Sequence, residues 1–203
     1  MKDEIQLTDR ERAVFADLDF MPLKAKVWEK MERLLAQLRE ALNLHLQTSP
    51  QHFAEAGIGM EGKISRGENY QTYAYRVLDY PAVFEKDDLF VFRTVILWGR
   101  PMGFHLILSG RYKTQYEPLF LAAAPRLPEK FLLSAQSHPW IWEPEPEKQL
   151  PIDRTSGEML KKILSERDFL KLSVYLPLEA YAEIPSFGLN TWQQIEKILF
   201  GEK

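Results

Sequence analysis

Two apolar runs, Leu89 to Trp98 and Gly103 to Ser109, lie on either side of the turn sequence Gly99-Arg100-Pro101-Met102. Apolar runs of this length around a Gly/Pro turn predict an antiparallel hairpin. Successive side chains of a strand point to opposite faces, so both faces of this hairpin would be largely apolar. Neither face can be fully solvated. The chain is therefore expected to cover one face of a sheet with helices, and part of the other face as well.

A turn centred on Arg100-Pro101 predicts the register of this hairpin. Ile96 then faces His105, and Arg93 faces Leu108. Because directly opposed residues share a face, this register places Arg93 and His105 on opposite faces of the sheet. Arg93 would be the one charge among the apolar residues of its face.

Arg93 needs an anionic partner in such surroundings, because an unpaired buried charge is very costly. Asp79, Glu68 and Glu61 are the nearest acidic candidates by strand order. Two interpretations follow. Arg93 forms a structural ion pair, or it receives the carboxylate or phosphate of a ligand.

The N-terminal quarter is predicted to be helical. Thr8-x-x-Glu11 has the spacing of a capping box, which predicts a short helix that ends before Pro22. Pro22 fits the first turn of a second helix, and Ser49-Pro50 marks its end. Apolar residues recur along the second helix at steps of three and four: Leu23, Val27, Met31, Leu34, Leu35, Leu38, Leu42 and Leu46. This stripe predicts an amphipathic helix that packs along one side.

Further elements follow the hairpin and precede it. Asn69 to Tyr80 and Phe131 to Gln136 are predicted strands, and Glu158 to Leu164 is a predicted short helix. Thr191-x-x-Gln194 predicts a capping box for a last helix, with Gly201 at its C-terminal cap. One more strand is predicted by alternation: Leu170, Leu172, Val174 and Leu176 alternate with Lys171, Ser173 and Tyr175. It would be half-buried, with its polar residues in water.

Helices that flank a run of strands predict the α+β class, with N-terminal helices packed on a mainly antiparallel sheet and with C-terminal helices. We expect a single domain over residues 1–203: helical 1–56, sheet-rich 60–136, a connector at 143–151 and a mixed segment at 152–203. The connector follows from Trp140-Ile-Trp-Glu-Pro-Glu-Pro-Glu, whose alternating Pro and Glu favour an extended, solvated segment.

The composition excludes several function classes. The chain contains no Cys, which excludes disulfides, thiolate catalysis and cysteine-ligated metals. Its net charge of −3 argues against a partner bound through a nucleic-acid backbone. The acidic N-terminus lacks the apolar run of a signal peptide. The best apolar stretch, Leu89 to Trp98, is too short for a bilayer span. A cytoplasmic location without membrane contact is expected.

Three short motifs follow one another between Lys63 and Arg111: Lys63-Ile-Ser-Arg-Gly-Glu-Asn-Tyr70, Leu78-Asp-Tyr-Pro81, and Phe92-Arg-Thr94 before a Trp-Gly turn. Together they resemble a bacterial family of conserved hypothetical proteins. The resemblance covers about a quarter of the chain and implies a bacterial, cytoplasmic protein. Since that family has no assigned activity or catalytic residues, it implies no functional residue here.

Motifs for cofactors and metals find little support. Gly57-Ile-Gly-Met-Glu-Gly62 matches G-x-G-x-x-G, but a helix-like segment precedes it and a strand-like one follows. This order is the reverse of a dinucleotide site, so we interpret the motif as a loop. No two histidines have the i, i+4 spacing of a helical metal site, and His52-x-x-Glu55 is interpreted as part of a first turn. We therefore expect no metal and no cofactor.

Aromatic residues gather at two places. Trp140 and Trp142 would either line a ligand groove or pack down before the connector, and we favour packing. Three tyrosines beside two arginines could imitate a stacking platform for bases: Tyr70, Tyr73 and Tyr75, with Arg66 and Arg76. Residues 60–120 carry a net charge of only +1, which is too little to drive binding to nucleic acid.

Two function classes remain, and no catalytic residue can be assigned. The first is a non-catalytic protein, a monomer or weak homodimer, that binds a small anionic or aromatic ligand or a protein partner. The second is an enzyme with Arg/Glu/Asp/His acid–base chemistry in a sheet-lined pocket. The candidate ligand-binding residues are Arg66, Glu68, Tyr70, Tyr75, Asp79, Arg93, Trp98 and His105. A free carboxylate among converging side chains would favour the enzyme, and paired side chains under an aromatic patch would favour the binding protein.

Overall fold

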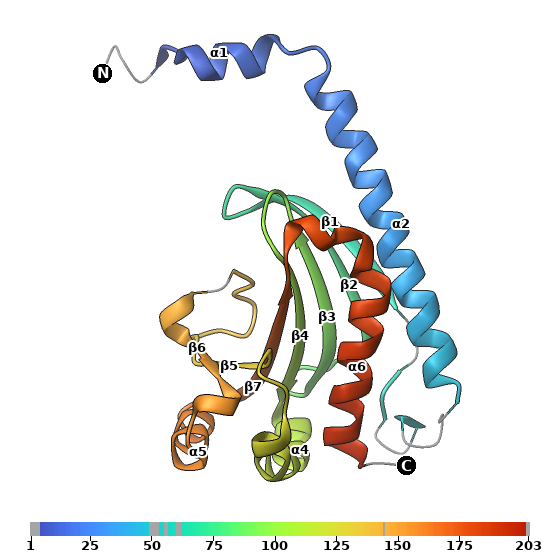
Figure 1. Ribbon diagram of the computed structural model, residues 1–203, viewed down its shortest axis with the longest axis vertical. Coiled ribbons are helices and arrows are strands. Elements are labelled where there is room, and N and C mark those ends of the chain that lie inside the picture. The colour runs from blue at the N-terminus through green and yellow to red at the C-terminus, as the bar shows by residue number, and fades with distance from the viewer. Residues whose placement is uncertain (1–4, 49–52, 55–56, 60–61, 144, 202–203) are drawn as a thin grey trace.

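The computed structural model describes residues 5–48, 53–54, 57–59, 62–143 and 145–201. Seven strands form one antiparallel sheet in the order β1-β2-β3-β4-β7-β5-β6 (Figure 1). The strands are β1 (Lys63–Tyr70), β2 (Tyr73–Phe84), β3 (Leu89–Leu97), β4 (Met102–Ser109), β5 (Leu132–Ser134), β6 (Gln149–Pro151) and β7 (Phe169–Leu176). The helices are α1 (Asp9–Ala16), α2 (Phe20–Leu46), α4 (Gly110–Ala123), α5 (Gly157–Ser165) and α6 (Ile184–Phe200). The predicted α+β class is confirmed.

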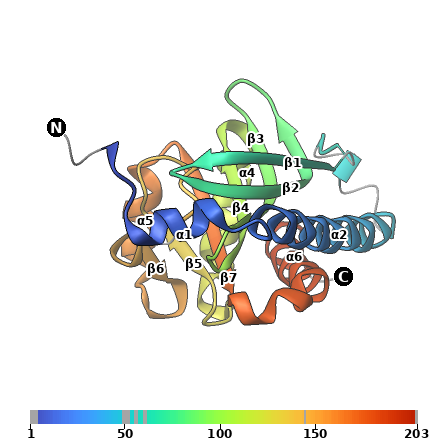
Figure 2. The same cartoon turned by 90° about the horizontal axis from the view of Figure 1, so that it is seen from above.

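Helices α2 and α6 lie side by side along one face of the sheet (Figures 1 and 2). The core between them and the sheet includes Trp192, which is fully buried and lies 5.3 Å from the ring of Phe92. Gly188 allows the close approach of α6, since a Cβ atom there would lie 2.7 Å from Leu38 and 2.9 Å from Phe104. This face of the sheet is therefore sealed by packed apolar side chains.

The N-terminal helices begin as predicted but pack over a shorter length. The Thr8 capping box is present at the start of α1, and Pro22 lies in the first turn of α2. The stripe is buried from Met31 to Leu46, whereas Leu23 and Val27 are exposed. Their predicted burial is wrong because this end of α2 extends beyond the sheet (Figure 1). No helix in the described part of the chain has both the length and the apolar character to cross a bilayer.

The predicted hairpin forms, but its register is wrong by three residues. Arg93 pairs with His105, not with Leu108, and Phe90 pairs with Leu108. The chain reverses around Gly99, whose φ of +71° suits a residue without a Cβ atom, rather than at Arg100-Pro101. Because the shift is an odd number of residues, β4 presents its other face. Arg93 and His105 therefore lie on the same face of the sheet.

Several other boundaries differ from the predictions. The strand expected over 69–80 is interrupted at Gln71 and Thr72, which turn with positive φ between β1 and β2. Helix α4 was not predicted. Thr191 is a buried residue inside α6, not an N-cap, because that helix begins at Ile184 in front of a proline. The cap at Gly201 is confirmed.

The predicted solvated connector, residues 143–151, is wrong at its C-terminal end. Gln149–Pro151 forms β6, which pairs with β5. The described part of the Gly57–Gly62 motif is turn and coil, while Met60 and Glu61 lie outside the described residues, as do Ser49-Pro50, His52 and Glu55.

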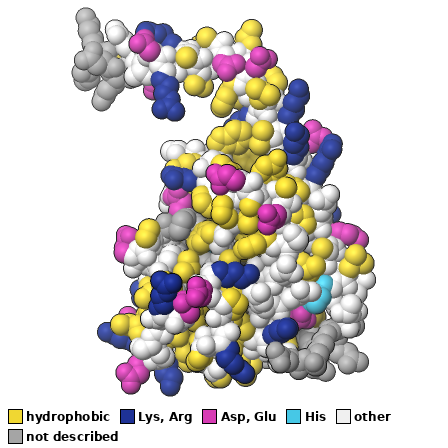
Figure 3. All heavy atoms as spheres, in the orientation of Figure 1, with side chains coloured by type: hydrophobic (Ala, Val, Ile, Leu, Met, Phe, Trp, Pro, Cys, Tyr) yellow, Lys and Arg dark blue, Asp and Glu magenta, His cyan; other side chains and the backbone are white. Residues whose placement is uncertain are grey.

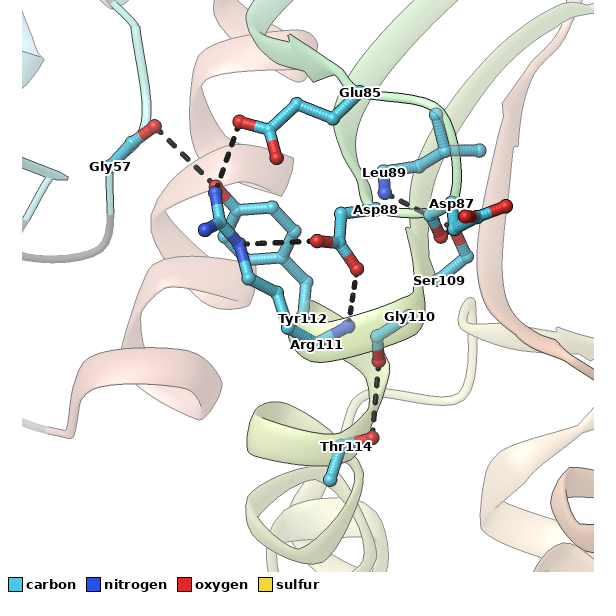
Figure 4. A network of polar contacts seen from close by, with 10 residues as sticks. All are labelled: Gly57, Glu85, Asp87, Asp88, Leu89, Ser109, Gly110, Arg111, Tyr112 and Thr114. Atoms are coloured by element: carbon cyan, nitrogen blue, oxygen red, sulfur yellow. Dashed lines mark hydrogen bonds and ion pairs between the residues drawn. The ribbon is translucent and has the colours of Figure 1, made fainter.

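A polar network fixes the loop between β2 and β3 to the start of α4 (Figure 4). The backbone N–H of Arg111 donates to Asp88 at 2.7 Å, and the Arg111 guanidinium lies 3.2 Å from Glu85. The hydroxyl of Ser109 donates to the carbonyl of Asp87 at 2.8 Å. Two carboxylates thus balance the charge of Arg111, which indicates a structural role for this network.

Candidate functional site

A row of polar side chains crosses the face of the sheet that α2 and α6 leave uncovered. The strand register places Asp79 opposite Arg93, Arg93 opposite His105, and His105 opposite Ser173. Lys171 lies one step along β7, on the same face. The described part of the segment between β5 and β6, residues 135–143 and 145–148, crosses over this row, and we call it the strap.

Arg93 and Asp79 form a bidentate ion pair. The guanidinium donates from Nε to Oδ1 at 2.6 Å and from Nη2 to Oδ2 at 2.9 Å. Both side chains are about nine-tenths buried, with 11% and 9% of their surfaces exposed. The guanidinium also lies 4.5 Å from the ring of Trp140 and 5.4 Å from that of Trp142. Of the two predicted partners that the structure describes, Asp79 and Glu68, it is Asp79 that pairs with Arg93, and Glu61 lies outside the described residues.

Lys171 is completely buried on the same face. Its ammonium group donates to the backbone carbonyl of Ile141 in the strap and lies 3.5 Å from Oε1 of Gln136. Among the described residues, no carboxylate lies within ion-pair distance of it. Burial, with a smaller contribution from the charge of Arg93, lowers the pKa of Lys171 to about 7. This amine can therefore gain or lose its proton near neutral pH.

His105 lies between the two cations and is completely buried. Its Nδ1 atom is 3.0 Å from the hydroxyl of Ser173, and its Nε2 atom has no hydrogen-bond partner in the described part of the chain. Burial, followed by the charges of Lys171 and Arg93, holds the pKa of His105 well below its usual value. The ring is therefore neutral at physiological pH. Its Nε2 atom lies over Gly103 of β4, where a Cβ atom would be only 2.4 Å away.

The strap seals this row with aromatic rings and hydrogen bonds. Trp142 stacks on Tyr70 with ring centroids 4.2 Å apart, and its backbone N–H donates to the Tyr70 hydroxyl at 2.9 Å. Gln136 donates to the carbonyl of Glu143 at 3.0 Å, within the strap. The indole N–H of Trp142 is buried and has no partner in the described residues. The favoured interpretation, that Trp140 and Trp142 pack down, thus matches their position.

The structure brings together five of the eight candidate residues. Tyr70, Tyr75, Asp79, Arg93 and His105 all lie on the face under the strap. Arg66, Glu68 and Trp98 do not join them. Glu68 is ion-paired with Lys24 of α2, Arg66 lines a groove against α2, and Trp98 packs 5.3 Å from Trp28 of the same helix.

Sequence reasoning missed three residues of this site: Lys171, Ser173 and Gln136. The alternation along β7 predicted that Lys171 and Ser173 face water, yet both are fully buried. The alternation is correct, but the strap covers the second face. The aromatic pair in the strap was the available indication that a segment packs there, without showing on which strands.

Other pockets on the surface are weaker candidates for a functional site. One of them, of about 750 Å³, lies beside α6. Its histidine, His45, is already paired with Glu196 and lies near Gln193. Within the described residues, no three His, Asp or Glu side chains are placed to hold a metal ion. The row under the strap is therefore the best candidate site.

Comparison with known proteins gives no family for this chain. No family model, no curated protein and no solved structure matches it.

Proposed function

We propose that this protein binds a small organic anion on the strap-covered face of the sheet, between Arg93 and Lys171. The observation that carries the proposal is the buried ammonium of Lys171, which has only neutral oxygen partners among the described residues. Asp79 balances Arg93, so the second cation has no counter-charge in the row. A ligand carboxylate would supply that charge.

The groups around Lys171 match the other requirements of such a ligand. The free Nε2 atom of His105 and the free indole N–H of Trp142 can each form one hydrogen bond. The rings of Trp140 and Tyr70 add flat apolar surface. An aromatic carboxylate combines these features in one molecule. Entry requires the strap to lift, since the row is buried beneath it.

The pairing of the carboxylates favours binding over acid–base catalysis. Both oxygens of Asp79 accept from Arg93, which removes the general base that the enzyme alternative needs. Glu68 lies on the other face and is paired with Lys24. Arg66 and Glu68, which the Arg/Glu/Asp/His chemistry of the enzyme alternative would include, therefore lie apart from Asp79, Arg93 and His105.

Ligand-induced stabilisation tests the proposal. Thermal unfolding at pH 7 should shift upward with benzoate, and much less with the neutral isostere benzamide, since only the anion compensates Lys171. Isothermal titration in two buffers of different ionisation enthalpy should show proton uptake, because the anion raises the pKa of Lys171.

Lys171→Met should abolish both effects, whereas Lys161→Met, which removes an exposed lysine of α5, should leave them unchanged. Acetate and inorganic phosphate complete the set of probes. No stabilisation by any of the three anions, or equal stabilisation of Lys171→Met, would refute the proposal.

One observation favours a second candidate, an enzyme that uses the Lys171 amine itself. An amine with a pKa of about 7 is largely unprotonated in mildly alkaline solution and can act as a nucleophile toward a carbonyl. Glyoxylate, an aldehyde that is also a carboxylate, would condense with the amine and release water. Borohydride reduction followed by peptide mass mapping should then mark Lys171 before the exposed lysines. Labelling spread over the surface lysines would exclude this candidate.

A further inference from the structure

The N-terminal segment forms an arm that extends from the body of the protein. Helix α1 has no buried residue, and the first buried residue of α2 is Trp28. The arm, residues 5–27, turns through an elbow at residues 17–19 (Figure 1). Nine large apolar side chains along it are exposed: Ile5, Leu7, Val14, Phe15, Leu18, Phe20, Met21, Leu23 and Val27. Figure 3 shows such side chains gathered at the elbow and along the start of α2.

The size of this exposed surface is unusual for a monomer. The chain exposes 11919 Å², whereas a compact monomer of 23.8 kDa is expected to expose about 9,900 Å². Phe15 and Leu18 are 86% and 91% exposed, so packing within their own chain does not stabilise them. A helix of eight residues is marginal in water without tertiary contacts. Contact with a surface outside this chain is therefore needed to stabilise helix α1.

We propose that the arm packs against the arm of a second copy of this chain, in a two-fold symmetric dimer. The area fits a dimer: the nine side chains expose on the order of 1,000 Å² per copy, which is close to what each partner of a standard interface buries. Exposed apolar side chains lie on both sides of the elbow, and a two-fold axis lets the same surface cover itself.

The charges of the arm favour a second copy over other partners. Residues 5–27 contain four acidic and four basic side chains, so two arms do not repel each other. A neutral arm also lacks the basic excess that draws a helix to an anionic membrane. Among the described residues, Asp17 and Asp19 at the elbow have no ion pair, and neither do Lys26 and Lys30 on α2. Antiparallel arms would bring the elbow acids of one copy beside the lysines of the other.

Sedimentation equilibrium of the full chain tests the dimer. The wild-type protein should dimerise within the micromolar range, and Phe15→Glu together with Leu18→Glu should raise the dissociation constant by about 100-fold or more. The circular dichroism and thermal midpoint of this variant, measured at a concentration where both proteins are monomeric, should match the wild type, because the two side chains pack on nothing in their own chain. Met159→Glu, at an exposed apolar position on α5, is the matched control and should leave the dissociation constant unchanged.

Charge reversal tests whether the partner of the arm is a second copy of this chain. Lys26→Glu with Lys30→Glu should weaken the dimer, and adding Asp17→Lys with Asp19→Lys to the same chain should restore it. A wild-type protein that stays monomeric at about 100 μM, or a dimer unaffected by Phe15→Glu and Leu18→Glu, would overturn the proposal. So would a monomer that sediments with phosphatidylcholine vesicles through the same residues, which would identify lipid as the occupant.

Discussion

Arg93 and Lys171 carry two positive charges on one buried face, but they differ in how those charges are compensated. Arg93 has a bidentate carboxylate, whereas Lys171 has only a carbonyl and an amide oxygen. Breaking a buried ion pair strands the remaining charge. A buried amine without a counter-ion instead lowers its own pKa and loses its proton. The two residues are therefore expected to affect the stability of the folded state in opposite ways.

Arg93→Met should reduce the free energy of unfolding by about 3–5 kcal/mol, because it leaves Asp79 buried without its partner. Adding Asp79→Asn should recover part of that loss, since neither charge is then stranded. Urea titration of both single variants and the double variant gives the three free energies. A large loss without any recovery would contradict the importance of the pair, and an unchanged midpoint for Arg93→Met would show that the pair contributes nothing.

Lys171 should make stability rise with pH in the alkaline range. Its pKa is about 7 when folded and 10.5 ordinarily, so between these values the unfolded chain binds the additional proton. The folded state is therefore penalised fully below pH 7, and the penalty disappears as pH approaches 10.5. The rise should amount to a few kcal/mol.

The free energy of unfolding, measured by urea titration from pH 6 to pH 10, checks this slope. Lys171→Met should flatten it, whereas the control Lys161→Met should keep it. Equal slopes in the wild type and Lys171→Met would mean that the amine is not desolvated.

At the scale of elements, the contact between α2 and α6 depends on the absence of a side chain at Gly188. A Cβ atom there would lie within 3 Å of Leu38 and Phe104, both in the packed core. Gly188→Ala should therefore destabilise the protein by about 1–3 kcal/mol, despite the better helix propensity of Ala.

Gly157 provides the matched comparison. It lies in the first turn of α5, and a Cβ atom there would meet nothing within 4 Å. Gly157→Ala should be neutral or slightly stabilising in the same thermal and urea measurements. If both variants lose the same free energy of unfolding, then Gly188 is not needed for the close approach of α6 to α2.

At the scale of the molecule, the main core extends from Trp28 in α2 to Leu199 in α6 and includes both helices and the sheet. The N- and C-terminal parts of the chain thus complete one another's core. We predict a single cooperative unfolding transition in calorimetry, with equal calorimetric and van't Hoff enthalpies at a concentration where the chain is monomeric. Two resolved transitions, or a protease-stable fragment ending near Glu145, would contradict this prediction.

The sequence by itself determined the type of most elements, because apolar period and capping are local properties. The alternation in β7, the stripe from Met31 to Leu46 and the Thr8 capping box all fold as predicted. Asp79 and Arg93 could also be named from the need of a buried guanidinium for a partner.

Only the tertiary structure decided what covers the second face and which residues meet on it. A period of two shows that Lys171 and Leu172 face opposite ways, but not that the strap lies over Lys171. The meeting of Arg93 with His105 depended on a reversal at Gly99, because a register shifted by an odd number of residues exchanges the faces. Burial and register are set by segments distant in the chain, so local periodicity carries no information about them.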